Sequence, residues 1–395
     1  MINIRHIFAP VLTGILFMLS SCSGNGGRSD GSPVRTEGVT VDSASMVIPR
    51  HAKGFTVDYR PDGLILVDIA DPERAEAQMF RFAVMQDDSD VEIPDGYTPV
   101  KVPVERAVCM TSLQLSNFIK LGITDKVVGI TSTRHLRNEK MKSQLKAGTT
   151  HKIGIEGNFD NEVIMAINPD VIFISPFKRG GYDAIRGVGV PMIPHLGYKE
   201  LTPLGQAEWI KLVGLLTGHT ADANEIFDGI EKRYNSLVSL AADSENRPMV
   251  MSGEMRSGNW YAVGGDSFLA HLFRDAGADY FLKDNNESGG VTLDYETVYS
   301  NAAHADYWRI VNSFDGEFGY DTLEAQDKRY TDFDAWKNHG VIYCNMKEVP
   351  FYESMPVEPE VILADFIHVF HPSLLPEHNP VYYRLLKLKV RLLHL

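Results

Sequence analysis

Cysteine is scarce in this sequence. Only three of the 395 residues are cysteines, and only Cys109 and Cys344 lie beyond the first 22 residues. No CxxC pair occurs, so a zinc or redox motif of that type is excluded. Each of the two cysteines stands in a short, apolar, strand-like stretch. We therefore expect two small buried thiols rather than a disulfide or a pair of metal ligands.

An excess of positive charge is also absent. The chain carries 52 acidic and 38 basic residues, for a formal net charge of −14. A surface of this sign does not attract nucleic acid or an anionic membrane, although a local basic pocket is still possible. We expect no nucleic-acid partner.

Catalytic signatures are equally sparse. The stretch GGDSF at 264–268 holds a serine in a tight turn, but it lacks the second glycine of the G-x-S-x-G elbow. No phosphate-cradling G-x-x-x-x-G-K-[ST] motif is present. We expect a binding protein without enzymatic activity, with a surface hydrolase and a purely structural surface lipoprotein as the alternatives.

Long hydrophobic runs are missing after the N-terminus. The first residues combine Arg5 with an apolar stretch at 7–19 and then Leu-Ser-Ser-Cys, which resembles a bacterial lipobox ending at Cys22. We expect a signal peptide at 1–21, a lipid on Cys22 and a flexible linker at 22–50. A plain secretory signal is the alternative. The predicted location is the periplasm, with the lipid anchor as the only attachment to a bacterial membrane.

A β-rich segment is predicted at 51–100. The stretch at 54–69 alternates apolar and polar residues around Pro61-Asp62-Gly63, which is typical of a β-hairpin. The residues at 78–85 supply a third strand, and 93–99 reads as a turn. This segment is an extension that precedes the main fold.

From Val104 onward, strands alternate with helices. Strands are predicted at 106–111, 126–131, 170–175 and 191–196, and helices at 112–123, from 161 onward, and at 182–189. This order is typical of βαβ units with a parallel sheet, and ligands bind such sheets at the carboxyl ends of the strands. We assign 101–202 to an N-terminal α/β lobe.

Two helices without an intervening strand follow, at 203–218 and 220–244. The second is about 35 Å long at 1.5 Å per residue, which is enough to connect two domains. The alternation then restarts, with helices predicted at 268–278 and 359–372 and a strand at 340–346. A loose repeat relates 160–175 to 294–313. We therefore predict an α/β fold of two Rossmann-like lobes with parallel sheets, with 203–246 as the connecting helices and 247–380 as the C-terminal lobe.

The stretch E-x-I-x-A-x-x-P-D-x-I at 162–172, the stretch GGDSFLAHLFRDAGADYF at 264–281 and the connecting helix resemble the periplasmic substrate-binding proteins of ABC importers. The resemblance is to the class for iron-siderophores, haem and cobalamin, and it covers 104–371. The segment at 51–100 is similar to an elaboration of Bacteroidetes-type lipoproteins. The resemblance implies a monomer whose two lobes are held by a rigid helix, with the ligand in the cleft between them.

The resemblance also implies a function. The chain would capture an iron chelate, either a ferric siderophore or haem, and deliver it to the permease and ATPase subunits of an importer. Cobalamin or another corrinoid, and direct capture of a transition metal, are the alternatives. No cofactor is expected besides this ligand.

Loops after the predicted strands supply the candidate ligand-binding residues. Aromatic rings suit stacking on a flat chelate, and cations suit its negative charge. The candidates are Met110, Thr111, Arg134, Glu156, Phe177, Lys178, Arg179, His195, Glu254, Arg256, Trp260 and Tyr261.

Several histidines invite a metal hypothesis. His135 and His195 would bind a metal directly if Glu156 or Glu254 added an oxygen ligand, but their spacing is not diagnostic. The pair His368 and His371 lies among apolar residues that are typical of a packed helix end. We assign no metal site.

Two glutamates occupy matching places in the repeat. Glu162 and Glu296 each follow an aspartate-initiated turn and precede an apolar helix face. A carboxylate in the first turn of a helix is also favoured by the helix dipole alone. In the resembling family, one glutamate on each lobe docks onto arginines of the permease, so these two residues are the candidates for permease docking.

Overall fold

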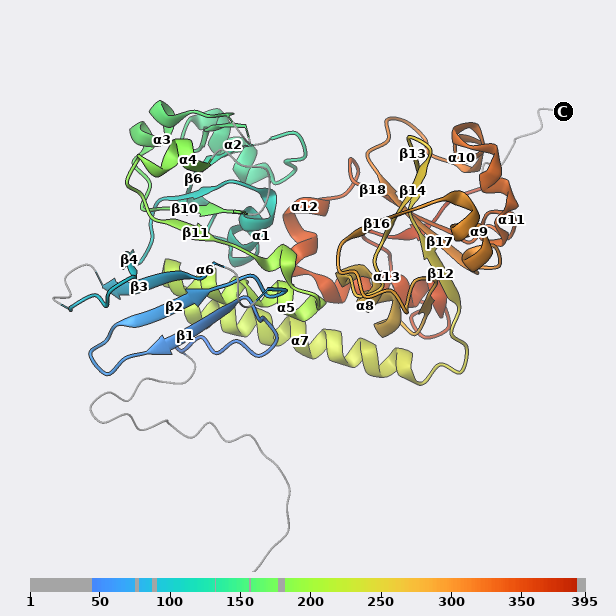
Figure 1. Ribbon diagram of the computed structural model, residues 1–395, viewed down its shortest axis with the longest axis horizontal. Coiled ribbons are helices and arrows are strands. Elements are labelled where there is room, and N and C mark those ends of the chain that lie inside the picture. The colour runs from blue at the N-terminus through green and yellow to red at the C-terminus, as the bar shows by residue number, and fades with distance from the viewer. Residues whose placement is uncertain are drawn as a thin grey trace, which may run out of the picture.

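The computed structural model describes residues 45–74, 78–86, 91–131, 133–155, 158–176 and 182–388. Two α/β lobes stand side by side, and helix α7 (Thr220–Ala242) passes beneath both of them (Figure 1). The predicted fold class is thereby confirmed.

The N-terminal lobe is built on a fully parallel five-stranded sheet. Its order is β11-β10-β5-β6-β7, and the central strands consist entirely of buried residues. A strand that is covered on both faces has an almost uninterrupted apolar sequence, and this pattern predicts the central strands. The strands are β5 (Ala107–Cys109), β6 (Val127–Ile130), β7 (His151–Lys152), β10 (Val171–Ile174) and β11 (Met192–Pro194).

Short helices surround this sheet. They are α1 (Ser112–Leu121), α2 (Glu139–Ala147), α3 (Asn161–Ile167) and α4 (Tyr182–Arg186), with the 3-10 turns η2 (Thr124–Lys126) and η3 (Gly197–Lys199) and the small hairpin of β8 (Gly154–Ile155) and β9 (Asn158–Phe159). Helix α2 was not predicted. Its mean hydropathy is low and only Met141 is buried, so it lacks the apolar stripe on which helix prediction depends.

The C-terminal lobe repeats the architecture with additions. Its main sheet has the order β15-β12-β17-β18-β19, in which only β19 is antiparallel, and a second sheet has the order β13-β14-β16. The strands are β12 (Met249–Ser252), β13 (Glu254–Arg256), β14 (Asn259–Val263), β15 (Asp279–Tyr280), β16 (Gly290–Leu293), β17 (Tyr307–Asn312), β18 (Val341–Asn345) and β19 (Arg384–Leu385).

The helices of this lobe include all those expected from the sequence. They are α8 (Phe268–Asp275), α9 (Tyr295–Ala302), α10 (Tyr320–Gln326), α11 (Asp334–Lys337), α12 (Phe351–Ser354) and α13 (Pro359–Phe370), with the 3-10 turns η4 (Lys328–Asp332) and η5 (Met355–Val357). Helix α12 and turn η5 lie against α1 of the other lobe. The two lobes therefore contact each other directly as well as through α7.

The connecting region departs from the prediction in one respect. The single helix expected at 203–218 is divided into α5 (Pro203–Glu208) and α6 (Ile210–Thr217), with the boundary at Trp209. The indole N–H of Trp209 donates to the buried carboxylate of Glu200 at 2.9 Å. The break therefore coincides with a fixed aromatic side chain that apolar periodicity does not reveal.

The N-terminal extension is a four-stranded sheet of order β1-β2-β3-β4. Its strands are β1 (Phe55–Tyr59), β2 (Ile65–Ile69), β3 (Phe80–Gln86) and β4 (Thr98–Val102). The predicted hairpin is confirmed, since β1 and β2 are antiparallel around 60–64. The stretch predicted only as a turn at 93–99 instead runs into β4, which pairs in parallel with β3.

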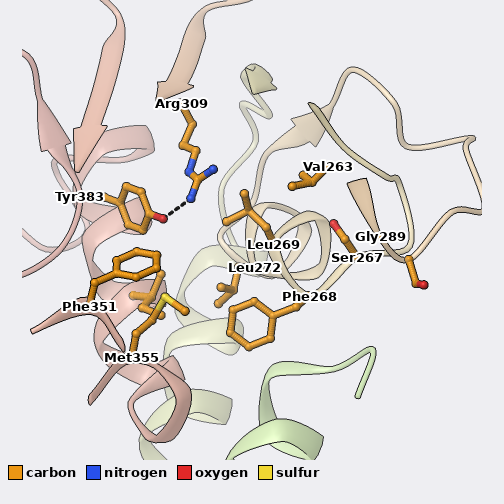
Figure 2. A pocket seen from close by; sticks show the side chains of 12 residues that line it. Val263, Ser267, Phe268, Leu269, Leu272, Gly289, Arg309, Phe351, Met355 and Tyr383 are labelled. Atoms are coloured by element: carbon orange, nitrogen blue, oxygen red, sulfur yellow. Dashed lines mark hydrogen bonds between the residues drawn. The ribbon is translucent and has the colours of Figure 1, made fainter. Parts of the chain in front are cut away.

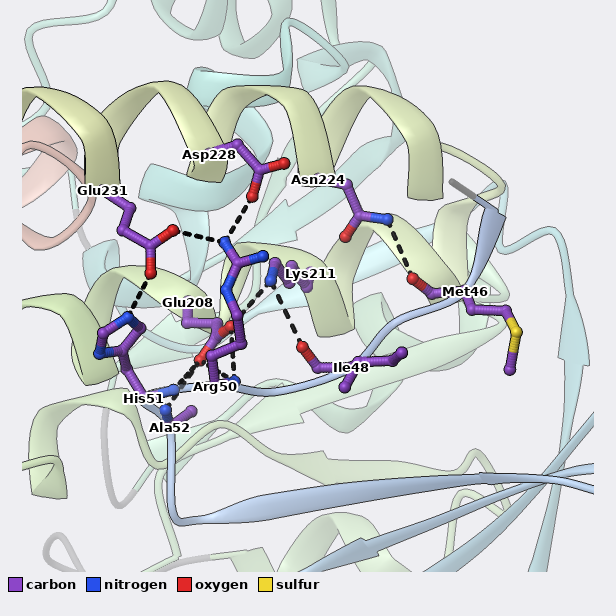
Figure 3. A network of polar contacts seen from close by, with 10 residues as sticks. All are labelled: Met46, Ile48, Arg50, His51, Ala52, Glu208, Lys211, Asn224, Asp228 and Glu231. Atoms are coloured by element: carbon purple, nitrogen blue, oxygen red, sulfur yellow. Dashed lines mark hydrogen bonds and ion pairs between the residues drawn. The ribbon is translucent and has the colours of Figure 1, made fainter. Parts of the chain in front are cut away.

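The extension shares its core with the N-terminal lobe. Phe55 of β1 meets Trp209 edge-on with 5.0 Å between ring centroids, and Val67 and Phe82 belong to the same apolar cluster as Phe118 of α1. The segment before β1 is held by buried carboxylates of the connecting region, as Figure 3 shows for Glu208. The extension is therefore packed onto the main fold and is not a loose appendage.

Both predicted buried thiols are confirmed. Cys109 on β5 and Cys344 on β18 are free and buried. Burial in an apolar sheet raises the pKa of each thiol far above its usual range, which keeps both of them protonated and unreactive.

Candidate functional site

Five of the predicted functional residues lie outside the described residues. They are Cys22, Glu156, Phe177, Lys178 and Arg179. Their roles remain hypotheses drawn from the sequence.

Three predicted ligand contacts lie in the protein interior, and the structure corrects these assignments. Met110, His195 and Trp260 are exposed by only 3%, 1% and 0%. Trp260 packs against Trp308 and donates its indole N–H to the carbonyl of Ser252 at 2.9 Å. None of the three side chains presents a surface to a ligand.

His195 is a neutral core residue. Its ring lies 4.9 Å from that of Trp209, and Nε2 is 3.2 Å from the amide nitrogen of Asn117. Burial lowers the pKa of His195 to about 3. His195 follows the carboxyl end of β11, but that position in the backbone does not fix the direction of the side chain.

The hairpin of β13 and β14 holds the remaining candidates from the second lobe. Glu254 pairs with Tyr261 across the hairpin, while Met255 pairs with Trp260 on the opposite face. Side chains alternate between the two faces of a strand. Trp260 points inward, so Glu254, Arg256 and Tyr261 share the outward face of the hairpin. Arg256 donates to Glu254 at 3.1 Å with 60% of its side chain exposed, and Tyr261 is 44% exposed.

Thr111 begins helix α1 at the carboxyl end of β5. Its N–H donates to the side chain of Gln114 at 2.9 Å, and its hydroxyl oxygen is buried without a partner among the described residues. This unpaired hydroxyl at the edge of the N-terminal sheet keeps Thr111 among the candidates.

Cations from both lobes gather where the lobes meet. Arg134 and Arg137 follow β6 in the N-terminal lobe, and Lys347 follows β18 in the C-terminal lobe. His135 lies between them, with its ring 5.3 Å from that of Tyr352 on α12. We call these five residues the inter-lobe cluster.

Electrostatics links the members of the inter-lobe cluster. Burial lowers the pKa of His135, and the charges of Arg134, Lys347 and Arg137 lower it further, so the imidazole stays neutral at pH 7. Lys347 pairs at 2.6 Å with Asp315, a carboxylate that is itself 88% exposed. The cluster therefore combines positive charge with two adjacent rings.

A buried carboxylate fixes this arrangement. Glu353 on α12 accepts hydrogen bonds from the backbone N–H groups of Arg137 and Asn138 at 2.6 and 2.9 Å. A second link joins Lys120 of α1 to Glu358 at 2.9 Å. The loop that carries Arg134 and Arg137 is thus held directly by the opposite lobe.

The sequence interpretation found only Arg134 of the cations in this cluster. Lys347 follows β18, a strand that is predicted correctly. The expectation that ligand-binding residues lie after the strands, which selects Arg134, therefore applies to Lys347 as well. Tyr352 lies on α12, which has only four residues and was not predicted. Its position depends on contacts between residues far apart in the chain, which no local pattern reveals.

The two candidate docking glutamates occupy equivalent positions. Glu162 lies in the first turn of α3 behind the N-cap Asp160, and Glu296 lies in the first turn of α9 behind the N-cap Asp294. Both glutamates are exposed, and their helices lie on different lobes (Figure 1). Each aspartate accepts a hydrogen bond from the backbone N–H three residues later.

The part of the chain that the structure describes has no group of three histidine, cysteine or acidic residues that would hold a metal ion. No helix there has the length and apolar character to cross a membrane. His371 of the pair considered above is buried, and its ring nitrogens contact Ser244 and the carbonyl of Gly277.

This chain is similar to known proteins in sequence and in fold. An uncharacterized lipoprotein of Methanocaldococcus jannaschii is 23% identical over 71% of this chain and 69% of its own length. A periplasmic heme-binding protein from Pseudomonas aeruginosa superposes with a TM-score of 0.57 at 17% identity, covering 72% of this chain and 99% of that one.

A structure from Saccharomonospora viridis, described as an ABC-type Fe3+-hydroxamate transport system, superposes with a TM-score of 0.52 at 18% identity, covering 68% of this chain and 94% of that one. These likenesses establish the shared two-lobe fold. The model of the periplasmic binding protein family matches residues 108–347, which is more than half of the sequence and spans both lobes. The chain therefore belongs to the periplasmic binding protein family.

Proposed function

We infer that this protein is the substrate-binding lipoprotein of an ABC importer and that it captures an iron-bearing chelate, either a ferric siderophore or haem, between its two lobes. It would then deliver the chelate to the permease. The inter-lobe cluster is the observation that carries the choice of ligand. In it, the charges of Arg134, Arg137 and Lys347 act on His135, and the ring of His135 lies 5.3 Å from that of Tyr352.

An anionic, partly aromatic chelate matches this chemistry. Arginine and lysine compensate its negative charge, and rings stack on its flat surfaces. Arg256 and Tyr261 on the outward face of the β13–β14 hairpin would extend the contact. Among the residues outside the described ranges, Phe177, Lys178 and Arg179 would add one further ring and two cations.

The proteins that share the fold support this inference. One solved structure binds heme and another belongs to a Fe3+-hydroxamate transport system. The matched lipoprotein relative agrees with a lipid on Cys22.

Optical titration of the purified protein tests the ligand class. Haem, a ferric hydroxamate, a ferric catecholate and cyanocobalamin each have their own absorption bands, so one series of spectra distinguishes them. We expect haem or one of the ferric siderophores to bind. Binding of cyanocobalamin alone would assign the protein to corrinoid transport instead.

A pair of variants ties the ligand to the inter-lobe cluster. Arg137→Ala combined with Lys347→Ala should weaken binding of the chelate at least tenfold, since each lost charge contact contributes about 1.5 kcal/mol. The matched control combines Lys142→Ala on α2 with Lys337→Ala on α11, two lysines that lie in surface ion pairs. Equal affinities of the two double variants would contradict the proposed site.

A further inference from the structure

Arg309 is a buried cation without a carboxylate partner. It lies in the middle of β17, it is only 8% exposed, and no ion pair involves it among the described residues. One guanidinium nitrogen donates to the hydroxyl of Tyr383, and the guanidinium stands 5.0 Å from the centre of that ring. Within the same described ranges, its Nε has no hydrogen-bond partner. A buried charge is costly unless it is paired, so this arginine needs an explanation.

The guanidinium faces a cavity of about 240 Å³ inside the C-terminal lobe. Figure 2 shows Arg309 and Tyr383 at one end, with the side chains of α8 and α12 around the remaining space. Most of the wall is apolar and comes from Val263, Leu269, Leu272, Phe351, Met355 and Ile362. The cavity therefore has one cationic end and an apolar body.

A second feature favours negative charge at this place. Ser267 lines the cavity and is the N-cap of α8, an eight-residue helix whose N-terminus carries the positive end of the helix dipole. The hydroxyl of Ser267 donates to the carbonyl of Gly264, so it stabilises the turn and does not compensate Arg309.

The cavity is open at a rim that includes Ser288 and Gly289. The N-terminal extension reaches this rim, because the hydroxyl of Ser288 donates to the carboxylate of Glu73, which also pairs with Lys199 at 2.8 Å. Glu73 is thus already compensated by Lys199, so it does not serve as the partner of Arg309.

We propose that this cavity is a separate binding site for a small monocarboxylate with an apolar tail. The carboxylate accepts hydrogen bonds from Arg309 and Tyr383, and the tail lies along Leu272, Phe351 and Ile362. A single charge fits better than a phosphate dianion, because Arg309 is the one cation among the described residues that line the cavity. The volume lies below the 300–1,000 Å³ typical of sites for drug-sized ligands, which limits the occupant to a short chain or a single ring.

This site differs from the inter-lobe cluster in its residues and its chemistry. It shares no residue with that cluster, and its ligand needs no metal. The proposal therefore stands whether or not the protein carries an iron chelate.

Calorimetric titration of the purified protein with octanoate tests the proposal, with 1-octanol as the neutral probe of the same length. We expect octanoate to bind and 1-octanol to bind at least tenfold more weakly. Arg309→Met, which keeps an unbranched side chain of similar length, should weaken octanoate binding at least tenfold. Arg329→Met removes a partly exposed arginine of the same lobe, which pairs with Asp327 at 2.7 Å, and should leave the affinity unchanged.

Tyr383→Phe provides a second variant in case Arg309→Met does not fold. It retains the buried ring and removes only the hydroxyl, so octanoate should bind several-fold more weakly. Absence of octanoate binding at millimolar concentration, or equal affinity of the wild type with both Arg309→Met and Tyr383→Phe, would overturn the proposal. Equal binding of octanoate and 1-octanol would also overturn it, because the cavity would then recognise only the tail.

Discussion

His195 is an uncharged histidine inside the N-terminal lobe, and it makes the stability of the protein depend on pH. Burial lowers its pKa in the folded state to about 3, whereas an unfolded chain protonates histidine near pH 6.5. The unfolded state therefore binds an additional proton between these two values. Stability is fully present above about pH 6.5 and decreases as the pH falls, by at most about 1.4 kcal/mol per pH unit for this one group.

Denaturant unfolding of the wild type and of His195→Gln, measured from pH 7.5 to pH 4.5, checks this prediction. The free energy of unfolding should depend less steeply on pH in the variant, by the equivalent of about one bound proton, whatever its absolute stability. Parallel profiles would mean that His195 is protonated in the folded protein. The pH profile of His371→Gln can be compared with that of His195→Gln, because burial also lowers the pKa of His371.

Two residues of the second lobe should respond in opposite ways to substitution. Trp260 is fully buried, so Trp260→Ala should lower the free energy of unfolding by about 4 kcal/mol through loss of apolar contacts and creation of a cavity. Arg256 has 60% of its side chain exposed, so Arg256→Ala should hardly change stability. It should instead weaken binding of an anionic chelate by about 1.5 kcal/mol.

Thermal unfolding without ligand and optical titration with the chelate separate these effects. If Arg256→Ala unfolds the protein while its folded fraction binds normally, Arg256 is structural. If Trp260→Ala retains full stability, the interior position of its ring is wrong.

At the scale of elements, a buried carboxylate joins the segment before β1 to the connecting helices. Glu208 at the end of α5 is fully buried and accepts hydrogen bonds from the backbone N–H groups of Arg50, His51 and Ala52 at 2.6–2.9 Å. Lys211, only 2% exposed, pairs with it at 2.8 Å (Figure 3). Although burial raises the pKa of Glu208, the hydrogen bonds from Lys211 and the backbone outweigh it, and the pKa falls below its usual value.

Glu208→Ala should destabilise the protein by about 3 kcal/mol, because it leaves Lys211 as a buried unpaired charge and three N–H groups without an acceptor. The double variant Glu208→Gln with Lys211→Met should cost less, since no charge stays unpaired. Glu231→Ala is the control, because Glu231 accepts only from the partly exposed side chains of Arg50 and His51. Chemical denaturation of the three proteins gives the comparison, and equal losses for all three would contradict the role of Glu208.

Element types followed from the sequence wherever apolar periodicity was strong. Strands such as β10 and β18 consist only of buried residues, and α7 has a clear apolar stripe, so both kinds of element were predicted. The elements that were missed lack such a signal. Helix α2 buries one residue, and β4 exposes or half-exposes four of its five residues.

Site residues were harder to predict than elements. The carboxyl end of a strand is a place in the backbone, whereas a binding role depends on where the side chain points. The alternation in β14 does carry that information, because Trp260 and Ala262 are buried while Asn259 and Tyr261 are exposed. The approach of Tyr352 to His135 depends on how the two lobes pack, and single-sequence patterns do not contain it.

At the scale of the whole molecule, several contacts join the lobes. Helix α7 passes beneath both of them, Glu353 binds the loop of the other lobe, and Glu73 of the extension reaches Ser288. We expect these contacts to hold the outer surfaces of the two lobes at a nearly constant separation. A partner that recognises both lobes at once would then find its contact points at fixed positions.

The proposed anchor at Cys22 belongs to this scale, because it places the whole molecule at a membrane. Metabolic labelling with a fatty acid should mark the protein, and Cys22→Ala should abolish the mark. A single acyl chain anchors only marginally, so we expect more than one chain on the cysteine. Equal labelling of the variant would exclude Cys22 as the site.

Glu162 and Glu296 are the candidates for contact with the permease, one on each lobe. Each lies in the first turn of a helix, where the dipole already favours a carboxylate by about 0.3 to 1 kcal/mol, so a purely local role predicts a small loss of stability and nothing more. A docking role predicts a different pattern. Exposed charges of opposite sign steer and align two surfaces while adding little to the affinity for the transported ligand.

The double variant Glu162→Ala with Glu296→Ala should therefore bind its chelate normally in solution while uptake, or stimulation of the transporter ATPase, falls sharply. The matched control is Glu139→Ala with Glu324→Ala, which removes one exposed glutamate from each lobe at α2 and α10. Both double variants lose two negative charges. A difference in uptake between them would therefore depend on where the glutamates lie and not on the net charge of the protein. Equal uptake by the two would leave Glu162 and Glu296 as helix-start carboxylates without a partner on the permease.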